Sequence, residues 1–518
     1  MSVSSGAARD VLTGTLARYL LLLVNIALGA LLLPFTVRHL GKADYGLWML
    51  AASLAAYLQL LDLGYGNGLV RQLARADARG DEEEMNVVLS TFAVVYGALG
   101  LAALLGIALL ALVVLPRFPS LTPDQVSTGR WLLAILGLRV AAGLPMSVFG
   151  AITTARQRFA LTTSIAIVVV LVQGLVTWIV LRAGHGLVPL VAATTAVGLA
   201  SYAAYAAAAW RTFPGLRLSS SRFSAAHVRE VTAFSFYLFL VGIAIQVSAS
   251  VPNLVVGAAL GTSAVAVYAV AARLAEYQRL LCGQFSGLLF PVVVRFHASC
   301  DREALRATLL EGTRLAVALV AGVTLCLLAF GRPIVELWMG SGFEGSVLPL
   351  YVLAVGGVVV VAQGPTGNIL LATGRHRLVA WVSMIEIALA VGCSLALVGP
   401  LGLAGVALGA SVPYAVLNVG LMMPLASRSV GLPYGTLLRA AVTPALRAAM
   451  PATALAAFLR AGAPPDSLVV ALGQAGAVGL LHAAAFWWIG LPAADRARYA
   501  GALRDVMARK LHPQVAAS

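Results

Sequence analysis

The stretch LGKADYGLWMLAASLAAYLQLL, residues 40–61, returns at an offset of 220 as LGTSAVAVYAVAARLAEYQRLL, residues 260–281. Gly41 aligns with Gly261, and apolar, small and aromatic positions match along both copies. Such similarity at a fixed offset indicates a duplicated chain. These two segments therefore predict a fold built from two related halves.

The composition places the chain in a membrane. Hydrophobic residues make up 60% of the 518 residues and charged residues 11%, whereas soluble domains carry roughly 25% charged residues. Apolar runs of about 20 residues, each long enough to cross the hydrocarbon core, recur along the chain. Alternating strand patterns are absent, which argues against a β-barrel. We therefore predict an all-α polytopic membrane protein with about fourteen transmembrane helices.

The fourteen predicted spans divide into two sets of six and a final pair. The thirteenth is short and lies between prolines. The spans are 15–36, 46–70, 87–114, 129–152, 161–182, 187–210, 231–256, 264–296, 313–330, 347–371, 379–398, 401–426, 447–460 and 467–491.

A second pair of segments extends the duplication. TARQRF at 154–159 aligns with TGRHRL at 373–378, at an offset of 219. Because each unit has an even number of helices, both units point the same way across the membrane, so the pathway is expected between them. We predict a six-helix bundle over 1–215 and a second, pseudo-symmetric one over 216–430. Residues 431–518 are expected to form an extra helix pair and an amphipathic cytoplasmic tail.

The formal net charge of +15 reports orientation here rather than a nucleic-acid partner. Most of the 35 Lys and Arg residues fall in alternate short loops, and the loops between them hold few. By the positive-inside rule the basic loops and both termini are cytoplasmic. We therefore predict a multi-pass protein of the bacterial cytoplasmic (inner) membrane.

Several segments resemble the polysaccharide-transporter (oligosaccharide flippase) family of the multidrug/oligosaccharidyl-lipid/polysaccharide exporter superfamily. In LPFTVRHLGKADYGLWMLAASLAAYLQLLDLGYGNGLVR (33–71) the matching features are the outer loop HLGKADYG, Trp48 and the exit LLDLGYGNGLVR. The second copy LGTSAVAVYAVAARL, the turn TGRHR and the Gly-rich GPLGLAGVALG at 399–409 add to the resemblance. Together these segments extend the resemblance over nearly the whole chain.

The resemblance, and not the hydropathy, implies a function. It implies alternating access and export of an undecaprenyl-pyrophosphate-linked oligosaccharide (an O-antigen, capsule or exopolysaccharide repeat unit) from the inner to the outer leaflet. The implied partners are this lipid-linked oligosaccharide, membrane lipids, and a polysaccharide polymerase with its chain-length machinery. No cofactor is implied, and H⁺ or Na⁺ is the candidate coupling ion.

Charges inside the eighth apolar run are the first candidates for a substrate site. Arg273 lies about 13 Å from the start of this run, near mid-membrane. Arg273, Glu276 and Arg279 step by three and so share one side of the helix. Glu276 can neutralise one arginine but not both, and the surplus guanidinium is well shaped for the pyrophosphate that the resemblance implies. The alternative is a structural ion network.

Four further ionisable residues are weaker candidates. Arg139 lies midway along the fourth span and is the best partner from the first half. Arg18, near the cytoplasmic end of the first span, faces the cavity or snorkels to the interface. Asp62 lies in LLDLGYGNG near the inner end of the second span, where it can bond exposed amides at the Gly-rich break or pair with Arg18. Glu386 is a lone carboxylate of the eleventh span, and both acids have a possible coupling or structural role.

Two rival functions remain open. A multidrug or cation antiporter of the same superfamily requires a net acidic cavity, whereas here the embedded arginines outnumber the acids. A membrane glycosyl polymerase or ligase has a large periplasmic loop, whereas the longest predicted outer loops, 115–128 and 331–346, are short. The sequence has no P-loop lysine motif and no metal-spaced His/Cys cluster. We therefore predict a transporter and not an enzyme, with no catalytic or metal-binding residues.

Overall fold

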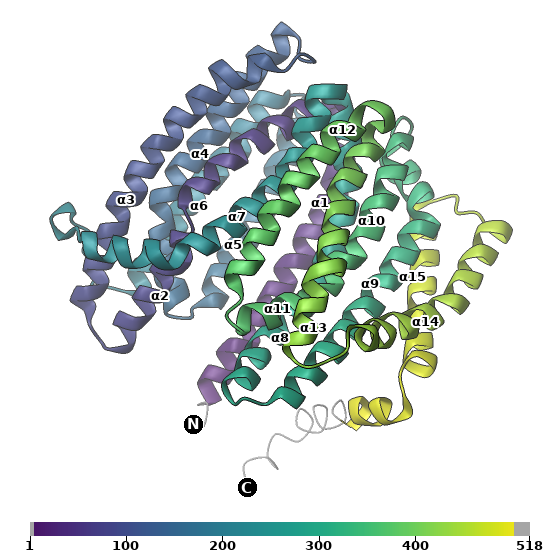
Figure 1. Cartoon of the computed structure of the whole chain (residues 1–518). Helices are drawn as coiled ribbons and strands as arrows, with labels where there is room; N and C mark the ends of the chain where they lie inside the picture. The colour runs from purple at the N-terminus through teal and green to yellow at the C-terminus, as the bar shows by residue number, and fades with distance from the viewer. Residues whose placement is uncertain (1–4, 502–518) are drawn as a thin grey trace. The chain divides into compact units, whose positions relative to one another are not determined.

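The computed structural model describes the backbone of residues 5–501 and the side chains of this segment except 5–16, 18, 233, 234, 237 and 238. Every regular element in this part of the chain is helical (Figure 1). The α-helices are α1 (Ser5–Ala56), α2 (Tyr65–Ala78), α3 (Glu82–Leu109), α4 (Pro123–Ala155), α5 (Phe159–Arg182), α6 (Leu187–Thr212), α7 (Ala225–Leu260), α8 (Thr262–Ala298), α9 (Arg302–Met339), α10 (Val347–Ala362), α11 (Gly364–Ala372), α12 (His376–Leu417), α13 (Met423–Ser429), α14 (Tyr434–Gly462) and α15 (Leu468–Ala485).

Twelve helical segments of the described chain are long and apolar enough to cross a membrane. Two of them, Tyr19–Ala78 and His376–Ser429, have 60 and 54 residues, so as straight helices they would be about 80–90 Å long in a hydrocarbon core of about 30 Å. Gly41 and Gly402 interrupt them with φ values of 82° and 56°. Each of the two therefore contains two crossings, and the predicted number of about fourteen is confirmed.

The duplication is visible in the backbone at its best-matched glycines. Gly41 has φ 82° and ψ 165°, and its aligned partner Gly261 has φ 87° and ψ 173°. Only glycine adopts this region without strain, because it has no Cβ. The two copies therefore turn the chain in the same way at the same aligned position.

The turns before α5 and before α12 also share one set of backbone hydrogen bonds. In each, a residue with positive φ (Gln157 or Gly374) donates to the carbonyl three residues back. The next residue (Arg158 or Arg375) donates to the carbonyl five residues back. The matching bonds lie at an offset of 217, so the alignment at an offset of 219 was wrong by two positions. The turn itself is repeated, but its hydrogen bonds pair Arg375 with Arg158, whereas the sequence alignment paired Arg375 with Arg156.

The contacts divide the chain into two compact units, Met1–Val270 with His376–Ala410, and Ala271–Arg375 with Ser411–Ser518. The boundaries between the units fall inside α8 and α12. The division of the sequence into repeats at residues 215 and 430 stays a prediction.

In the first unit α4 is the central helix, and it packs against α1, α2, α3 and α6. Figure 1 shows α3, α4 and α6 side by side. One core, around Leu73, Phe92 and Ile152, joins α2, α3 and α4. A second, around Leu54 and Leu132, joins α1 and α4.

In the second unit α9 is the central helix, and α10, α11, α14 and α15 pack against it. Phe330 of α9 packs against alanines of the last two helices, among them Ala452 of α14 and Ala471 of α15. Small side chains let membrane helices approach closely. Buried His482 of α15 completes the contact, since its Nε2 lies 2.9 Å from the carbonyl oxygen of Ala318 on α9.

The thirteenth predicted span, 447–460, was too short. The helix α14 has 29 residues and contains Pro444 and Pro451 in its interior. Proline cannot donate a backbone hydrogen bond and usually ends a helix in water, which is why the sequence suggested a boundary there. In membrane helices, neighbouring groups can satisfy the freed carbonyl and the helix continues.

The backbone at Gly41 gives a direct test of the fold. An alanine Cβ there would meet no atom within 4 Å, so the cost of Gly41→Ala is that of the backbone alone, about 1–3 kcal/mol. We expect a lower apparent Tm for the purified variant in detergent. Gly97→Ala on α3 is the matched control, because its Cβ also meets nothing within 4 Å and its φ is not positive. An equal Tm for both variants would contradict the strained turn.

Candidate functional site

The helix α8 has one buried stripe and one charged side. Four residues of the stripe are at most 1% exposed, and at about 100° per residue they fall within one sector of about 60°. They are Ala271, Ala275, Gln278 and Cys282. Arg273 and Glu276 lie on the opposite side of the helix, with their side chains 42% and 43% exposed.

Gln278 fixes the orientation of this part of α8. Its Nε2 donates to Thr324 Oγ1 of α9 at 2.7 Å and to the carbonyl oxygen of Ala354 of α10 at 3.1 Å. A Cβ on residue 357 would lie 2.6 Å from Gln278 Oε1, so Gly357 makes room for the amide. Because the glutamine is held by two helices, the charged side of α8 is directed away from them.

The structure brings Arg273 and Glu276 together. Arg273 Nη1 donates to Glu276 Oε2 at 2.8 Å, one helical turn along α8. Arg279 lies on the next turn and is half-buried. The segment thus carries two guanidinium groups and one carboxylate, a net charge of +1, on a partly open helix face.

Arg139 of α4 is the other embedded arginine of the predicted set. Its side chain lies against Gly198 of α6, where a Cβ would be 2.7 Å from the guanidinium Nε. Tyr202 donates its hydroxyl to the backbone carbonyl of Arg139 at 3.2 Å. No described residue forms an ion pair or a side-chain hydrogen bond with the guanidinium, so its charge is uncompensated within the described chain.

Asp62 ends the 3₁₀ turn Tyr57–Asp62 that follows α1. The hydroxyl of Tyr96, buried on α3, donates to Asp62 Oδ1 at 2.6 Å. The amide of Gly66, on the first turn of α2, lies 3.5 Å from Oδ2. Sequence reasoning missed Tyr96, because it belongs to a different helical element and no pattern in the sequence links it to the aspartate.

The remaining predicted candidates are less fully defined. Glu386 is half-buried on α12, in the first unit. The backbone of Arg18 is part of α1, but its side chain lies outside the described residues, so its suggested pairing with Asp62 stays a prediction.

A second charged cluster joins helix ends of the first unit. Arg156, at the end of α4, donates from Nε to Asp77 Oδ1 of α2 at 2.9 Å and from Nη1 to the carbonyl oxygen of Thr212 of α6. Its guanidinium also lies 4.9 Å from the centroid of the Phe213 ring. Arg156 belongs to the basic turn TARQRF noted in the sequence. Its contacts connect α4 to α2 and α6, so its role is to stabilise the packing of these helices.

The chemistry available to these residues is ionic and hydrogen-bonding. The described residues include no group of three His, Cys, Asp or Glu side chains placed to hold a metal ion. Guanidinium groups present a rigid fork of donors that matches phosphate oxygens. The guanidinium groups on each unit can therefore attract an anion.

Two arrays of apolar helices long enough to cross a membrane, with a few embedded charges, define a polytopic membrane protein. The family model described as polysaccharide biosynthesis protein matches residues 11–297, more than half of the chain. The chain belongs to this family of polysaccharide biosynthesis proteins. It is 26% identical over 416 residues to the uncharacterized membrane protein EpsK of Bacillus subtilis (strain 168), with 76% of this chain and 79% of EpsK covered.

Solved structures with this fold include two kinds of membrane protein. The lipid II flippase MurJ in an inward closed conformation matches with a TM-score of 0.70 at 13% identity, over 92% of this chain and 98% of that chain. An inward-facing multidrug resistance MATE transporter matches with a TM-score of 0.61 at 17% identity, over 77% and 97%. The chain therefore has the MurJ and MATE fold, as the family resemblance predicted.

The two sides of α8 are expected to differ in their access to water. In a variant whose four native cysteines are replaced, a cysteine at position 273 or 276 should react with a charged, membrane-impermeant thiol reagent, because the thiolate that attacks the reagent forms in water. A cysteine at position 275 is the matched control, because Ala275 is 0% exposed. Labelling is read by mass in inside-out vesicles and in detergent. Equal reactivity at 273 and 275 would contradict the described orientation of α8.

Proposed function

We propose that this protein is a flippase that carries an undecaprenyl-pyrophosphate-linked oligosaccharide from the inner to the outer leaflet of the bacterial cytoplasmic membrane. Membership of the polysaccharide biosynthesis family supports a glycan-related cargo. The observation that carries the proposal is the embedded guanidinium of Arg139, which has no acid partner among the described residues. Arg273 and Arg279 add two further guanidinium groups on α8, where Glu276 pairs with Arg273.

The positive charge of the embedded arginines favours an anionic cargo. An ionisable residue at bilayer depth costs about 2.5–3.5 kcal/mol to insert, so it is retained where it faces protein, water or a ligand. Arg273 and Glu276 are too exposed to be a core ion pair. A hydrated pathway beside α8 would let the exposed guanidinium of Arg273 contact a pyrophosphate, while the sugars cross in water and the prenyl chain stays in lipid.

The antiporter alternative rests on the shared fold of the MATE transporters. It requires carboxylates that bind a cation, and Asp62 and Glu386 are the residues available for this and for H⁺ or Na⁺ coupling of the flippase. In the proposed mechanism the transport cycle uses alternating access and involves no covalent step. A polysaccharide polymerase and its chain-length machinery are the expected protein partners.

Replacing Arg273 with Gln tests the proposal. The change keeps a long polar side chain and removes the charge. Losing a charge-assisted phosphate contact costs about 1.5–3 kcal/mol, which is roughly tenfold or more in affinity. We expect normal accumulation in the membrane and loss of surface-polysaccharide export in the native host. Arg273→Lys should rescue in part, because it restores the charge without the planar fork.

The matched control is Arg302→Gln, an exposed arginine on the first turn of α9 with no side-chain partner among the described residues. Its export should stay normal. A fully active Arg273→Gln protein at ordinary levels would show that the charge does not act on the cargo. Failure of this variant to accumulate would assign Arg273 to a structural ion pair with Glu276.

The proposed direction of transport requires cytoplasmic termini. Alkaline phosphatase is active only outside the cytoplasm, so fusions within 118–122 or 340–343, between helices on the predicted outer side, should be active. Fusions within 79–81 or 213–219 should be inactive. Immunoblots control for the amount of each fusion protein. The reverse pattern would refute the orientation.

A further inference from the structure

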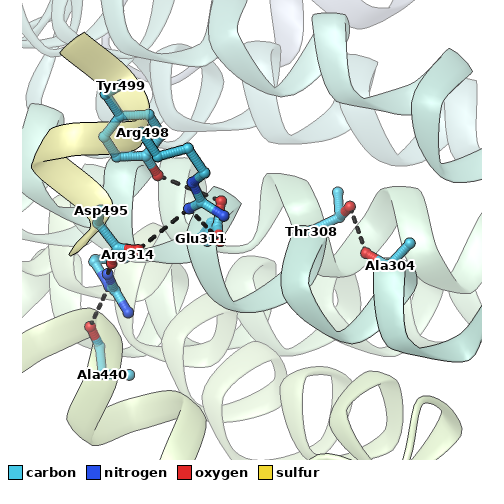
Figure 2. Close-up of polar contacts among 8 residues, drawn as sticks. All are labelled: Ala304, Thr308, Glu311, Arg314, Ala440, Asp495, Arg498 and Tyr499. Atoms are coloured by element: carbon cyan, nitrogen blue, oxygen red, sulfur yellow. Dashed lines mark hydrogen bonds and ion pairs between the residues drawn. The ribbon is translucent and has the colours of Figure 1, made fainter. Parts of the chain in front are cut away.

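The C-terminal helical segment 493–501 is attached to α9 by a network of ion pairs (Figure 2). Arg314 Nη1 donates to Asp495 Oδ2 at 2.6 Å, and Arg498 Nη2 donates to Glu311 Oε1 at 2.6 Å and to Asp495 Oδ1 at 3.3 Å. Tyr499 adds its hydroxyl, 3.4 Å from Glu311 Oε2. Two arginines and two acids balance each other in this network.

Arg314 also supplies a hydrogen bond that the backbone of α14 lacks. Pro444 has no N–H, so the carbonyl oxygen of Ala440, four residues earlier, lacks its helical donor. Arg314 Nε donates to this oxygen at 3.2 Å. The side chain of Arg314 is only 10% exposed, so both its bonds and its charge are committed to the protein.

A cavity of about 340 Å³ lies beside this arginine. Arg439, Thr443 and Arg447 of α14 line it, at a spacing of four residues that places them along one helix face. Gly490 forms part of the opposite wall, where a Cβ would be 3.1 Å from the Pro444 carbonyl oxygen. The absence of that Cβ lets the end of the last membrane helix approach α14 and close the wall.

The charge of this cavity is not balanced. Arg439 and Arg447 are both exposed, and neither forms an ion pair or a side-chain hydrogen bond with another described residue. Since Asp495 already neutralises Arg314, the two arginines of α14 give the cavity a surplus charge of +2.

We propose that this cavity binds the phosphate headgroup of an anionic membrane phospholipid, with Arg439 and Arg447 as its charged ligands. Two forks of guanidinium donors fit phosphate oxygens, and Thr443 supplies a hydroxyl between them. The two arginines are eight residues apart, about 12 Å along the helix axis, so a lipid with two phosphates can contact both.

The position in the sequence favours a lipid as the source of this phosphate. Both arginines lie in the first half of α14, Arg439 on its second turn and Arg447 two turns further along. The predicted orientation puts the start of this helix on the cytoplasmic side, where the phosphates of inner-leaflet lipids lie. Basic pockets between membrane helices on the cytoplasmic side are typical sites for cardiolipin-like headgroups.

Binding can be measured on the full-length protein, purified and delipidated in detergent. The thermal shift is followed while tetraoleoyl-cardiolipin, dioleoyl-phosphatidylglycerol or zwitterionic dioleoyl-phosphatidylcholine is added in mixed micelles. We expect half-maximal stabilisation at lower concentration for cardiolipin than for phosphatidylglycerol, and little for phosphatidylcholine. Arg439→Gln and Arg447→Gln should each weaken the cardiolipin response about tenfold, and the double variant should respond to all three lipids alike.

Arg428→Gln is the matched control, because this arginine is exposed on α13 just before α14 and has no side-chain partner among the described residues. The Tm without lipid should be unchanged in every variant, since no protein contact is removed, and Arg439→Lys with Arg447→Lys should restore part of the response. A double Gln variant that keeps the cardiolipin preference would overturn the site. Equal stabilisation by millimolar inorganic pyrophosphate, lost in the same variants, would overturn a lipid as its ligand.

Discussion

A backbone carbonyl inside hydrocarbon has no water to bond, so a carbonyl that loses its helical N–H needs another donor. The clearest case is Ala440, whose oxygen loses its donor to Pro444 and gains Arg314 instead. The same guanidinium binds Asp495, so one arginine both satisfies the freed carbonyl in α14 and holds the C-terminal helical segment. Elsewhere the chain reverses at glycines with positive φ, outside the regular helices, where fewer carbonyls need a new partner.

The sequence predicted features that depend on local patterns. Hydropathy counts residues within one helix, so the number of crossings followed from it, and the aligned glycines Gly41 and Gly261 followed from the repeat. The pair Arg273 and Glu276 lies within one turn of one helix and was also predictable. By contrast, Arg314 and Asp495 are 181 residues apart, and only the folded chain brings them together. The charge of Arg439 and the proline at position 444 lowered the apparent apolarity of α14. The hydropathy of the sequence therefore did not reveal the first half of this helix.

The duplication also explains a close contact inside the first unit. Gly46 follows the turn at Gly41, and a Cβ on it would overlap the carbonyl oxygen of Thr262, which follows the turn at Gly261. The corresponding corners of the two repeats therefore meet backbone to backbone. The residue aligned with Gly46 in the second copy is Ala266. A Cβ on Gly46 would also lie 3.3 Å from the backbone nitrogen of Ala266, so the contact requires glycine in the first copy.

The acids and the arginines of the described chain differ in how completely they are paired. Among the described acids, Glu276, Glu311 and Asp495 are paired with arginines, and Asp62 accepts a hydrogen bond from Tyr96. The arginines without an acid partner in the described chain include Arg139 in the first unit and Arg439 and Arg447 in the second. Helix packing does not determine the sign of such residual charge, because apolar and small residues make the packing contacts. Proteins that share the fold can therefore differ in the sign of their ligand, and here unpaired guanidinium groups favour phosphate-bearing molecules in both units.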